Sequence, residues 1–379
     1  MYFLNGNRLY IKPARNNETL QEQLNDCLEQ IQQINEGKQV FKLNFFIDSN
    51  SDSNYLEIKT QIQNRVNALF SNRVMQTIIA QPPLNAKIIL EVFYYDPLVW
   101  KMQFVEENEN TAVLFKNNDT RFLIGSVQET KAANCKTNAE NAFSAIDSIL
   151  QETRFNTSDI IRQWNYIEAI LGFDTNQQRY QEFNDVRTTF YKDAFSKKGY
   201  PAATGIGMKN GGVIIEFIAV KSSKAITCPV DNPEQISAHH YSNEVLIGAR
   251  DKPKTTPKFE RARYFQYENK KMIFISGTAS IHGEKTVGID NAAKQTEITI
   301  NNIKQLYSGK AFRQLPAPKM RAQYGHARVY VKKLDDFNAI KTVFEKHYGK
   351  LPVVFIIADI CRDDLLVEIE GKVILKEIR

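Results

Sequence analysis

Two strings in the last third of the chain place chemically able side chains at the ends of apolar runs. Residues 274–281 read FISGTASI, and residues 358–371 read ADICRDDLLVEIEG. Each run is rich in Ile, Val, Leu and Phe, as a strand covered on one or both faces should be. Each is interrupted where a cleft would need a hydroxyl, a thiol, a guanidinium or a carboxylate, so the two strings predict a functional site.

A carboxylic acid is the first candidate for chemistry at this site. Glu368 and Glu370 lie within an apolar run, where burial would raise the pKa of a carboxyl and let it donate a proton at neutral pH. In an ideal strand both side chains point to the same face, because side chains repeat every second residue. Glu368 fits the role of proton donor, with Glu370 as the alternative that the sequence leaves open. A structural pairing of Glu368 with Arg362 is the competing interpretation.

Anion binding is the second chemistry that the residue types suggest. The planar guanidinium of arginine can donate two hydrogen bonds to one carboxylate, and tyrosine hydroxyls can add neutral donors. The candidate substrate-binding residues of these two types are Arg162, Tyr166, Arg179, Tyr180, Arg187, Arg328 and Arg362. Gly277 would leave room at the turn in the first string, where Thr278 could donate to a substrate.

The patterns of cysteine, histidine and glycine add little evidence for a further functional site. Cys361 precedes Arg362, whose charge would help to form a thiolate, but buried cysteines are usually inert, so residue chemistry alone favours a structural role. The four cysteines and five histidines lack the spacing of metal ligands, so no metal site is predicted. The glycines of 204–207 precede a strand instead of following one, which is the wrong order for a nucleotide-binding loop.

Two helices of the middle region are expected to position the arginines and tyrosines. Ser158 is an N-cap candidate for a helix over 159–171, in which Arg162 and Tyr166 lie four residues apart. A second helix over 176–195 has a face that carries Tyr180, Asn184 and Arg187.

The other elements read as a scaffold and a C-terminal domain. Residues 201–207 are expected to form a tight loop before a strand over 213–220, and residues 222–257 a connection. The N-terminal scaffold has helices over 18–34 and 56–71 and strands over 40–47 and 88–95. After the connection come strands 263–267 and 271–276, helix 290–306, strand 327–331, helix 335–348, and strands 353–360 and 365–375. This order predicts an α+β domain with a mixed sheet and helices on one face.

Bulk properties limit the class of protein. The chain has 379 residues and a formal charge of +6 that is spread without a block of five basic residues. Nucleic-acid binding is therefore disfavoured, whereas a mild positive balance would suit a small dianionic substrate. The sequence has no long uncharged apolar stretch and no secretory signal, so no membrane association is expected and the predicted location is the cytoplasm.

The order of elements after residue 262 and the ending LLVEIEG resemble the RidA/YjgF superfamily, which has a chorismate-mutase-like fold. A more specific similarity covers about the last 220 residues. Five strings in order resemble the chorismatase family: RQWNY (162–166), RYQEFNDVR (179–187), PAATG (201–205), ISGTASI (275–281) and ADICR (358–362). The first 115 residues show no comparable signature.

The resemblance implies a fold of RidA-like mixed sheets repeated along one chain as a pseudo-trimer. Residues 1–225 would then be an N-terminal scaffold region that could hold two degenerate units and that contributes the helices of 158–195. Residues 226–379 would be the C-terminal domain with the catalytic residues. A site completed within one chain predicts a monomer.

The resemblance also implies an enzyme without a cofactor that removes the enolpyruvyl group of chorismate as pyruvate. Some family members hydrolyse chorismate to a dihydroxycyclohexadiene carboxylate, and others release 3- or 4-hydroxybenzoate. Glu368 matches the family's catalytic acid, and Cys361 and Gly277 match residues of the hydroxybenzoate formers, which implies that they direct the outcome. The alternatives are the hydrolase reaction, a RidA-like imine deaminase and a non-catalytic metabolite binder.

Overall fold

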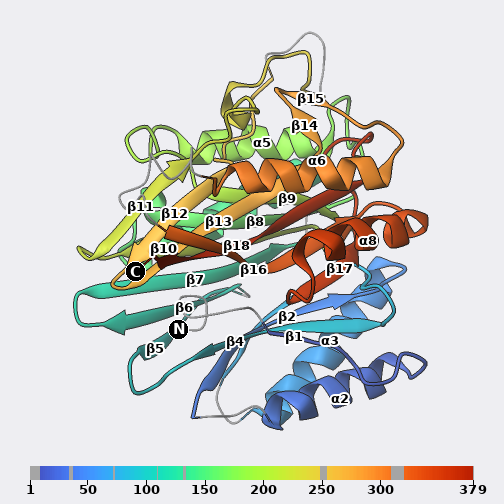
Figure 1. Ribbon diagram of the computed structural model, residues 1–379. Helices are drawn as coiled ribbons and strands as arrows, with labels where there is room; N and C mark the ends of the chain where they lie inside the picture. Colours follow the sequence, from blue (N-terminus) through green and yellow to red (C-terminus); the bar gives the residue numbers. More distant parts are fainter. Residues whose placement is uncertain are drawn as a thin grey trace.

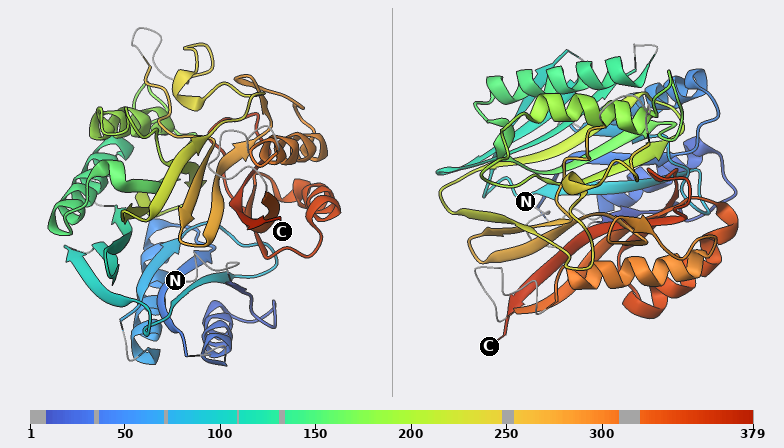
Figure 2. Two further views of the ribbon diagram at one scale, coloured as in Figure 1. Left: turned by 60° about the vertical axis from the view of Figure 1, so that its left-hand side comes forward. Right: turned by 90° about the horizontal axis from the view of Figure 1, so that it is seen from above.

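The computed structural model describes residues 9–33, 37–70, 73–108, 110–130, 134–247, 254–308 and 320–378. Within them the strands form one four-stranded sheet, two six-stranded sheets and a two-stranded ribbon. Figure 1 labels these elements, and the left view of Figure 2 shows the three larger sheets around a common centre with helices on the outside. The expected α+β class is confirmed.

The three larger sheets follow one another along the chain, and each forms a unit with its own helices. The first contains β1 (Leu9–Ile11), α2 (Leu20–Gln33), β2 (Gln39–Ile47), α3 (Asp52–Leu69), β3 (Met75–Ile79) and β4 (Ile88–Tyr95). The second contains β5 (Lys101–Glu107), β6 (Asn110–Asn117), β7 (Thr120–Glu129), α4 (Cys135–Glu152), β8 (Ile160–Glu168), α5 (Arg179–Tyr191), β9 (Ala202–Met208) and β10 (Val213–Lys221). The third contains β11 (Ala225–Val230), β12 (Ala262–Tyr267), β13 (Lys270–Ala279), α6 (Ala292–Gln305), β16 (Met320–Val331), α8 (Phe337–Tyr348), β17 (Val353–Ile357) and β18 (Val367–Glu377). The ribbon consists of β14 (Ile281–His282) and β15 (Lys285–Thr286).

The sheets share one topology. The second has the strand order β5-β6-β7-β10-β8-β9, and the third has the equivalent order β11-β12-β13-β18-β16-β17. The first, with the order β1-β4-β2-β3, corresponds to the last four strands of that pattern. Equivalent parallel pairs, β2 with β3, β8 with β9, and β16 with β17, occur in all three. The chain therefore repeats one α+β pattern three times, which agrees with the pseudo-trimer implied by the resemblance.

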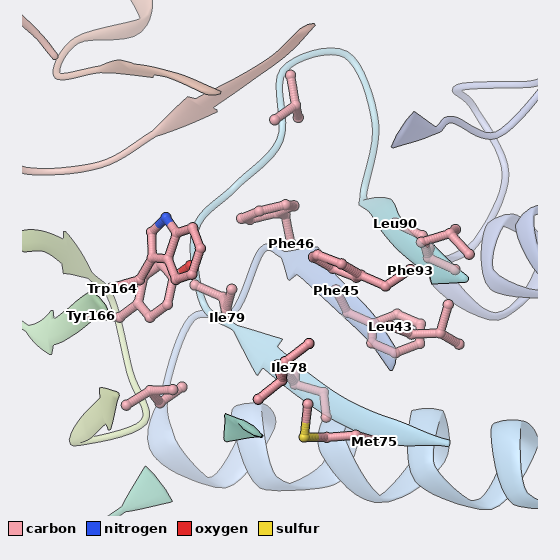
Figure 3. Close-up of a cluster of buried hydrophobic side chains, with 14 of the residues drawn as sticks. Leu43, Phe45, Phe46, Met75, Ile78, Ile79, Leu90, Phe93, Trp164 and Tyr166 are labelled. Carbon is pink, nitrogen blue, oxygen red and sulfur yellow. The ribbon is translucent and has the colours of Figure 1, made fainter. Parts of the chain in front are cut away.

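The inner faces of the sheets meet in a shared core. One hydrophobic cluster takes residues from all three sheets, including Phe45, Phe46, Trp164 and Tyr330. Figure 3 shows part of it, with Trp164 of β8 beside Ile79 of β3. Two further clusters lie under α4 and α5 on the second sheet and under α6 and α8 on the third. Helices thus cover the outer faces, and the inner faces cover one another.

Three buried ion pairs close a ring around this centre. Lys42 of the first sheet pairs with Glu216 of the second. Arg162 of the second sheet pairs with Glu370 of the third, and Arg328 of the third pairs with Glu91 of the first. Each sheet therefore gives a cation to one neighbour and a carboxylate to the other, as charges that leave water require partners. These six residues are called the central ring below.

The predicted helix over 159–171 is wrong. After a short 3-10 turn at Thr157–Asp159 the chain forms strand β8, which pairs with β10 and β9. Ile160, Ile161 and Trp164 have the spacing of a helical stripe, but they are β-branched or aromatic and favour strands. Every residue of β8 except the last is buried, because helices cover one face and the central core the other. A strand that is buried on both faces loses the two-residue alternation by which it is usually recognised.

The tight loop predicted for 201–207 is also wrong, because these residues begin strand β9. Its glycines permit close contacts with other elements. A Cβ at Gly205 would lie 2.9 Å from the ring of Tyr180, and one at Gly207 would lie 2.8 Å from the carbonyl oxygen of Asp359. The predicted connection 222–257 contains β11 and a 3-10 turn at Ala238–His240, and α4 and β5 to β7 were not anticipated.

The remaining predicted elements are confirmed, most of them with shifts of a few residues at their ends. These are the helices over 18–34, 56–71, 176–195, 290–306 and 335–348, and the strands over 40–47, 88–95, 213–220, 263–267, 271–276, 327–331, 353–360 and 365–375. The strand predicted over 327–331 begins earlier, at Met320, and residues 34 and 71 lie outside the described ranges.

Candidate active site

A cleft lies between the second and third sheets. Its walls come from α5 and β9 of one sheet, from β13 and β18 of the other, and from the segments around Tyr241 and Cys361. The space within it, which includes solvent at its mouth, has a volume of about 710 Å³. The polar or reactive side chains that line it include Tyr180, Asn184, Tyr241, Arg261, Cys361, Arg362 and Glu368.

Glu368 places a buried carboxyl in this cleft. The residue lies on β18 opposite Ala279 of β13 and is only 4% exposed. Its Oε1 is buried and has no hydrogen-bond partner among the described residues. Burial raises the pKa of Glu368 to about 8, and the nearby Glu370 carboxylate adds to this effect, while Arg162 and Arg261 oppose it. The carboxyl therefore carries its proton at neutral pH and can act as an acid.

The space for this carboxyl comes from an irregularity in β13. The pairing register between β13 and β18 shifts between Ile275 and Thr278, so Gly277 lies in a bulge. A Cβ at Gly277 would overlap Oε1 of Glu368, would lie 2.9 Å from its Cδ, and would lie 3.1 Å from Cγ2 of Thr204. Glycine is thus the residue that this position accepts without displacing Glu368.

Glu370 has different surroundings, although its side chain shares a face with that of Glu368. It accepts hydrogen bonds from Trp164 Nε1 at 2.8 and 3.0 Å and from the Tyr330 hydroxyl at 3.2 Å. Arg162 and the hydroxyl of Thr204 also donate to it. Glu370 belongs to the central ring and does not line the cleft. Of the two carboxyls that the sequence could not separate, Glu368 is the one that lines the cleft.

Two arginines add positive charge to the wall of the cleft. Arg261 donates from Nη2 to the carbonyl of Ile236 at 2.7 Å and to the Tyr241 hydroxyl at 2.5 Å. Its buried Nε has no partner among the described residues. Arg362 donates from Nη1 to the carbonyl of Glu284 at 2.8 Å. Their Cζ atoms lie 5.3 and 5.2 Å from the centre of the Tyr241 ring, which therefore contacts both guanidinium groups.

Sequence reasoning missed Arg261. The available signal is the pattern Arg261-Ala-Arg263 at the start of an apolar strand, which puts two arginines on the same side of that strand. Only the structure separates them. Arg263 donates hydrogen bonds to the carbonyls of Lys198, Gly199 and Tyr200 and to the Thr227 hydroxyl. It therefore connects the second sheet to the third. Tyr241 lies in the predicted connection and was missed as well.

Cys361 and Tyr180 meet at the wall of the cleft. Burial raises the pKa of the Cys361 thiol to about 12, and Glu368 adds to the effect against Arg362 and Arg261. The help that Arg362 was expected to give to a thiolate is outweighed, so Cys361 is a neutral thiol. Burial also raises the pKa of Tyr180, which remains a hydroxyl donor at neutral pH.

The other predicted binding residues lie elsewhere. Arg162, Tyr166 and Arg328 are buried at the centre, where the Tyr166 hydroxyl donates to Glu216 at 3.1 Å and accepts from Arg328 at 2.5 Å. Arg179, the first residue of α5, forms an ion pair with Asp174 at 2.7 Å and does not line the cleft. The cleft therefore brings together Tyr180, Gly277, Cys361, Arg362 and Glu368 from the predicted set.

Two predicted residues lie beside the cleft without lining it. Arg187 is buried and donates to Oδ1 of Asn184 at 2.5 Å, and Asn184 itself lines the cleft. Thr278 is buried and donates to the carbonyl of Ser276 at 2.9 Å. In the described ranges no group of three or more His, Cys, Asp or Glu side chains could hold a metal ion. The described helices include none that is long and apolar enough to cross a membrane.

Comparison with known proteins identifies the family. A 3-hydroxybenzoate synthase of Streptomyces hygroscopicus is 30% identical over 244 residues, which cover 61% of this chain and 68% of that protein. The chain belongs to the chorismatase family. A chorismatase of the same organism is 28% identical to this chorismatase over 282 residues, which cover 73% of this chain and 78% of the relative.

Two further comparisons agree with this assignment. Residues 99–219 match the family model described as chorismatase FkbO/Hyg5-like, N-terminal. A crystal structure of a chorismatase at 1.08 Å resolution superposes with a TM-score of 0.71 at 20% identity, covering 97% of this chain and 98% of the other. This chorismatase therefore shares the fold of that protein over 97% of its length, including most of the first 115 residues, where the sequence showed no signature.

Proposed function

We propose that this chorismatase removes the enolpyruvyl group of chorismate as pyruvate and releases a hydroxybenzoate. The observation that carries the proposal is the Glu368 carboxyl, which is protonated at neutral pH, has an oxygen without a partner among the described residues, and faces a cleft with two arginines. Cleavage of an enol ether begins with protonation of carbon and needs an acid of this kind.

The substrate's two carboxylates are bound on the cationic side of the cleft. Chorismate is a dianion, and each of Arg261 and Arg362 has donors left for a carboxylate after its bonds to the protein. The Tyr180 hydroxyl and the amide of Asn184 supply neutral donors from α5. This set replaces Arg162, Arg179 and Arg328 as the proposed anion-binding groups, because those arginines are bound to Glu370, Asp174 and Glu91.

The reaction starts with transfer of the Glu368 proton to the methylene carbon of the enolpyruvyl group. The electrons of the double bond form the new C–H bond, and positive charge develops at the ether carbon, where the carboxylate left on Glu368 stabilises it. The bond between the ring carbon and the ether oxygen then breaks with its electrons going to oxygen, which gives pyruvate. The ring then loses the proton of the carbon that carries the hydroxyl, and Glu368 takes this proton back, which gives 4-hydroxybenzoate. For 3-hydroxybenzoate the hydroxyl oxygen first moves to the neighbouring ring carbon that lost the ether oxygen, and the proton of the carbon that receives it is then lost. The two products together contain the atoms of chorismate, so no water is consumed.

The competing hydrolase reaction adds one water and yields a dihydroxycyclohexadiene carboxylate. Two features favour the hydroxybenzoate. Cys361 is a neutral thiol that fills cleft wall beside Glu368, and the 30% identical relative is named a 3-hydroxybenzoate synthase. We further propose that the chain acts as a monomer, since both walls of the cleft come from one chain, and that it works in the cytoplasm.

The test is incubation of the purified chain with chorismate, without added metal or nucleotide. Organic products are separated by chromatography and identified by mass, and pyruvate is assayed with a coupled dehydrogenase. Equal amounts of pyruvate and 3- or 4-hydroxybenzoate are expected, and the isomer assigns the position of the hydroxyl. Pyruvate with the dihydrodiol would move the chain to the hydrolase branch. Unchanged chorismate would overturn the proposal, and ammonia released from imino acids would then support a deaminase.

A further inference from the structure

Two junctions between sheets repeat one arrangement, and only one of them carries the acid. Thr77 on β3 pairs with Asn44, and Thr204 on β9 pairs with Trp164, at equivalent positions of the first and second sheets. Glu216 and Glu370 are likewise at equivalent positions. Glu216 lies opposite Trp164 of β8, Glu370 lies opposite Arg328 of β16, and these two strands hold the same place in their sheets. Each threonine therefore faces the glutamate of the following sheet.

The contacts at the two junctions match in part. Thr77 donates to Oε1 of Glu216 at 2.9 Å, and Thr204 donates to Oε2 of Glu370. Lys42 and Arg162 provide the cation that each glutamate requires. Both threonines are buried, so each hydroxyl takes part in joining two sheets through the central ring.

The junctions differ where the substrate would bind. Ile214 lies two residues before Glu216, whereas Glu368 lies two residues before Glu370. The Thr77 hydroxyl has a side-chain partner on β7, Ser126 at 2.8 Å. The Thr204 hydroxyl instead accepts from the backbone N–H of Gly277 at 3.0 Å, at the bulge that makes room for the Glu368 carboxyl.

The Thr204 hydroxyl uses its full capacity. A hydroxyl has one donor and two acceptor sites. Here it donates to Glu370 and accepts from Arg162 Nη2 at 2.7 Å and from Gly277 N at 3.0 Å. One buried group thus connects an ion pair of the central ring to the backbone that borders the acid. Loss of the hydroxyl would remove one hydrogen-bond partner from each of Glu370, Arg162 and the Gly277 N–H. The bulge would then lose the hydrogen bond that holds it to the Arg162–Glu370 pair.

We propose that Thr204 is a positioning residue for the Glu368 acid: its hydroxyl anchors the Gly277 bulge to the Arg162–Glu370 pair and so holds open the space in which the Glu368 carboxyl meets the substrate. The proposal rests on the proposed function for its consequence in catalysis. Thr204 does not line the cleft, so it acts through Gly277 and not through contact with chorismate.

The test compares Thr204→Val, which keeps the shape of the side chain without its hydroxyl, with Thr204→Ser, which keeps the hydroxyl. Thr77→Val is the matched control, because it removes an equivalent buried hydroxyl at the junction without an acid. A misplaced acid is expected to lower kcat in Thr204→Val by about 10- to 100-fold with KM within about twofold of wild type. Thr204→Ser should recover most of kcat, and Thr77→Val should change kcat by less than about twofold.

A second readout does not depend on turnover. Hydrogen exchange at the Gly277 amide, followed by NMR, is expected to be faster in Thr204→Val than in wild type and unchanged in Thr77→Val. If Thr204→Val does not fold, Thr204→Cys replaces it, since a thiol is a weak donor and acceptor and must show the same losses. Wild-type kcat and exchange in the Thr204 variants, or an equal loss of kcat in Thr77→Val, would overturn the proposal. A wild-type chain that leaves chorismate intact would overturn the proposed function instead, and exchange at Gly277 would still decide whether Thr204 anchors the bulge.

Discussion

Glu368 and Glu370 lie two residues apart on one strand face, and their neighbours give them different chemistry. Glu370 accepts from Trp164, Thr204 and Arg162, so its negative charge is compensated. Glu368 has a buried oxygen without a partner in the described ranges, and the charge of Glu370 nearby further disfavours its ionisation. The pair resembles other sites in which one carboxylate keeps another protonated. The ionised member is the structural one here, and the protonated member faces the cleft.

The same substitution at these two positions should therefore have opposite effects. Glu368→Gln keeps the shape but removes the proton donor, so kcat should fall by about 10²- to 10⁴-fold while the fold remains stable. Glu370→Gln leaves the buried Arg162 without its counter-charge, so the free energy of unfolding should fall by about 3–5 kcal/mol. Product formation and chemical denaturation of both variants are the measurements. Full activity in Glu368→Gln would exclude Glu368 as the acid.

Activity and stability should both depend on the ionisation of Glu368. The folded chain keeps this proton up to a pKa of about 8, whereas a glutamate in the unfolded chain loses it near its ordinary value of about 4.3. Between these values the folded state binds the extra proton, so the free energy of unfolding decreases as the pH rises through this window. In turn, kcat should fall as the pH rises through about 8, where the acid loses its proton.

The pH prediction is checked by kcat profiles and by denaturation from mildly acidic to alkaline pH. Glu368→Gln serves as the control, because it cannot ionise at this position. Its free energy of unfolding should lack the decrease seen in wild type and should exceed the wild-type value at alkaline pH. A wild-type kcat that stays level as the pH rises through 8 would contradict the predicted pKa.

Arg261 and Arg263 offer a second matched pair at this scale. Arg261→Lys keeps the charge in the cleft but loses the planar fork, so KM for chorismate should rise by about 10- to 100-fold with little change in kcat. Arg263 donates to backbone carbonyls of the second sheet, so Arg263→Lys should lower the melting temperature and leave KM near the wild-type value. Steady-state kinetics and thermal unfolding separate the two outcomes. Unchanged KM in Arg261→Lys would remove this residue from the proposed substrate-binding set.

At the scale of elements, the bulge in β13 links local backbone geometry to the choice of product. Gly277→Ala would place a methyl group where Oε1 of Glu368 now lies. Either the carboxyl or the bulge must move, so we expect the rate to fall by about tenfold or more. The hydroxybenzoate share of the product should also fall, because a displaced carboxyl or bulge would let water reach the ring. The measurement is the ratio of hydroxybenzoate to dihydrodiol by chromatography, and a wild-type rate and ratio would show that the site absorbs the methyl group.

Elements also explain what the sequence could and could not reveal. The strings around Gly277 and Cys361 and the carboxylate at Glu368 were predicted, because polar residues that interrupt apolar strands are visible without a structure. Strand β8 was mistaken for a helix because burial on both faces removes the alternation that marks a strand. That error placed Arg162 and Tyr166 on a helix face, whereas both are buried at the centre of the molecule. Arg261 was missed because the sequence does not show which of Arg261 and Arg263 is held by the protein. Arg263 donates to carbonyls of another sheet, which leaves Arg261 as the arginine that lines the cleft.

The whole molecule is built so that no sheet is complete alone. Each ion pair of the central ring joins two different sheets, and one hydrophobic cluster contains residues of all three. Backbone bonds add to these contacts, from Lys209 N to the carbonyl of Ala80, from Gly207 N to Asp359 and from Ile357 N to Pro82, each at 2.8 Å. The active-site cleft is one of the junctions that result, so its geometry depends on the assembly of all three sheets.

This arrangement predicts that the chain unfolds as one unit and that a distant ion pair matters for stability but not for binding. Lys42→Met leaves the buried Glu216 without its nearest cation, so the free energy of unfolding should fall by about 3–5 kcal/mol, while KM for chorismate stays near the wild-type value. Calorimetry should show a single transition, with the calorimetric enthalpy equal to the van't Hoff enthalpy.

The double variant Lys42→Met with Glu216→Gln tests the cause. It removes both charges but keeps an oxygen that can accept from Thr77 and Tyr166, so it should recover most of the stability lost in the single variant, since an unpaired buried charge costs more than an absent pair. Two separate transitions in the wild type would show that the first sheet folds independently of the other two.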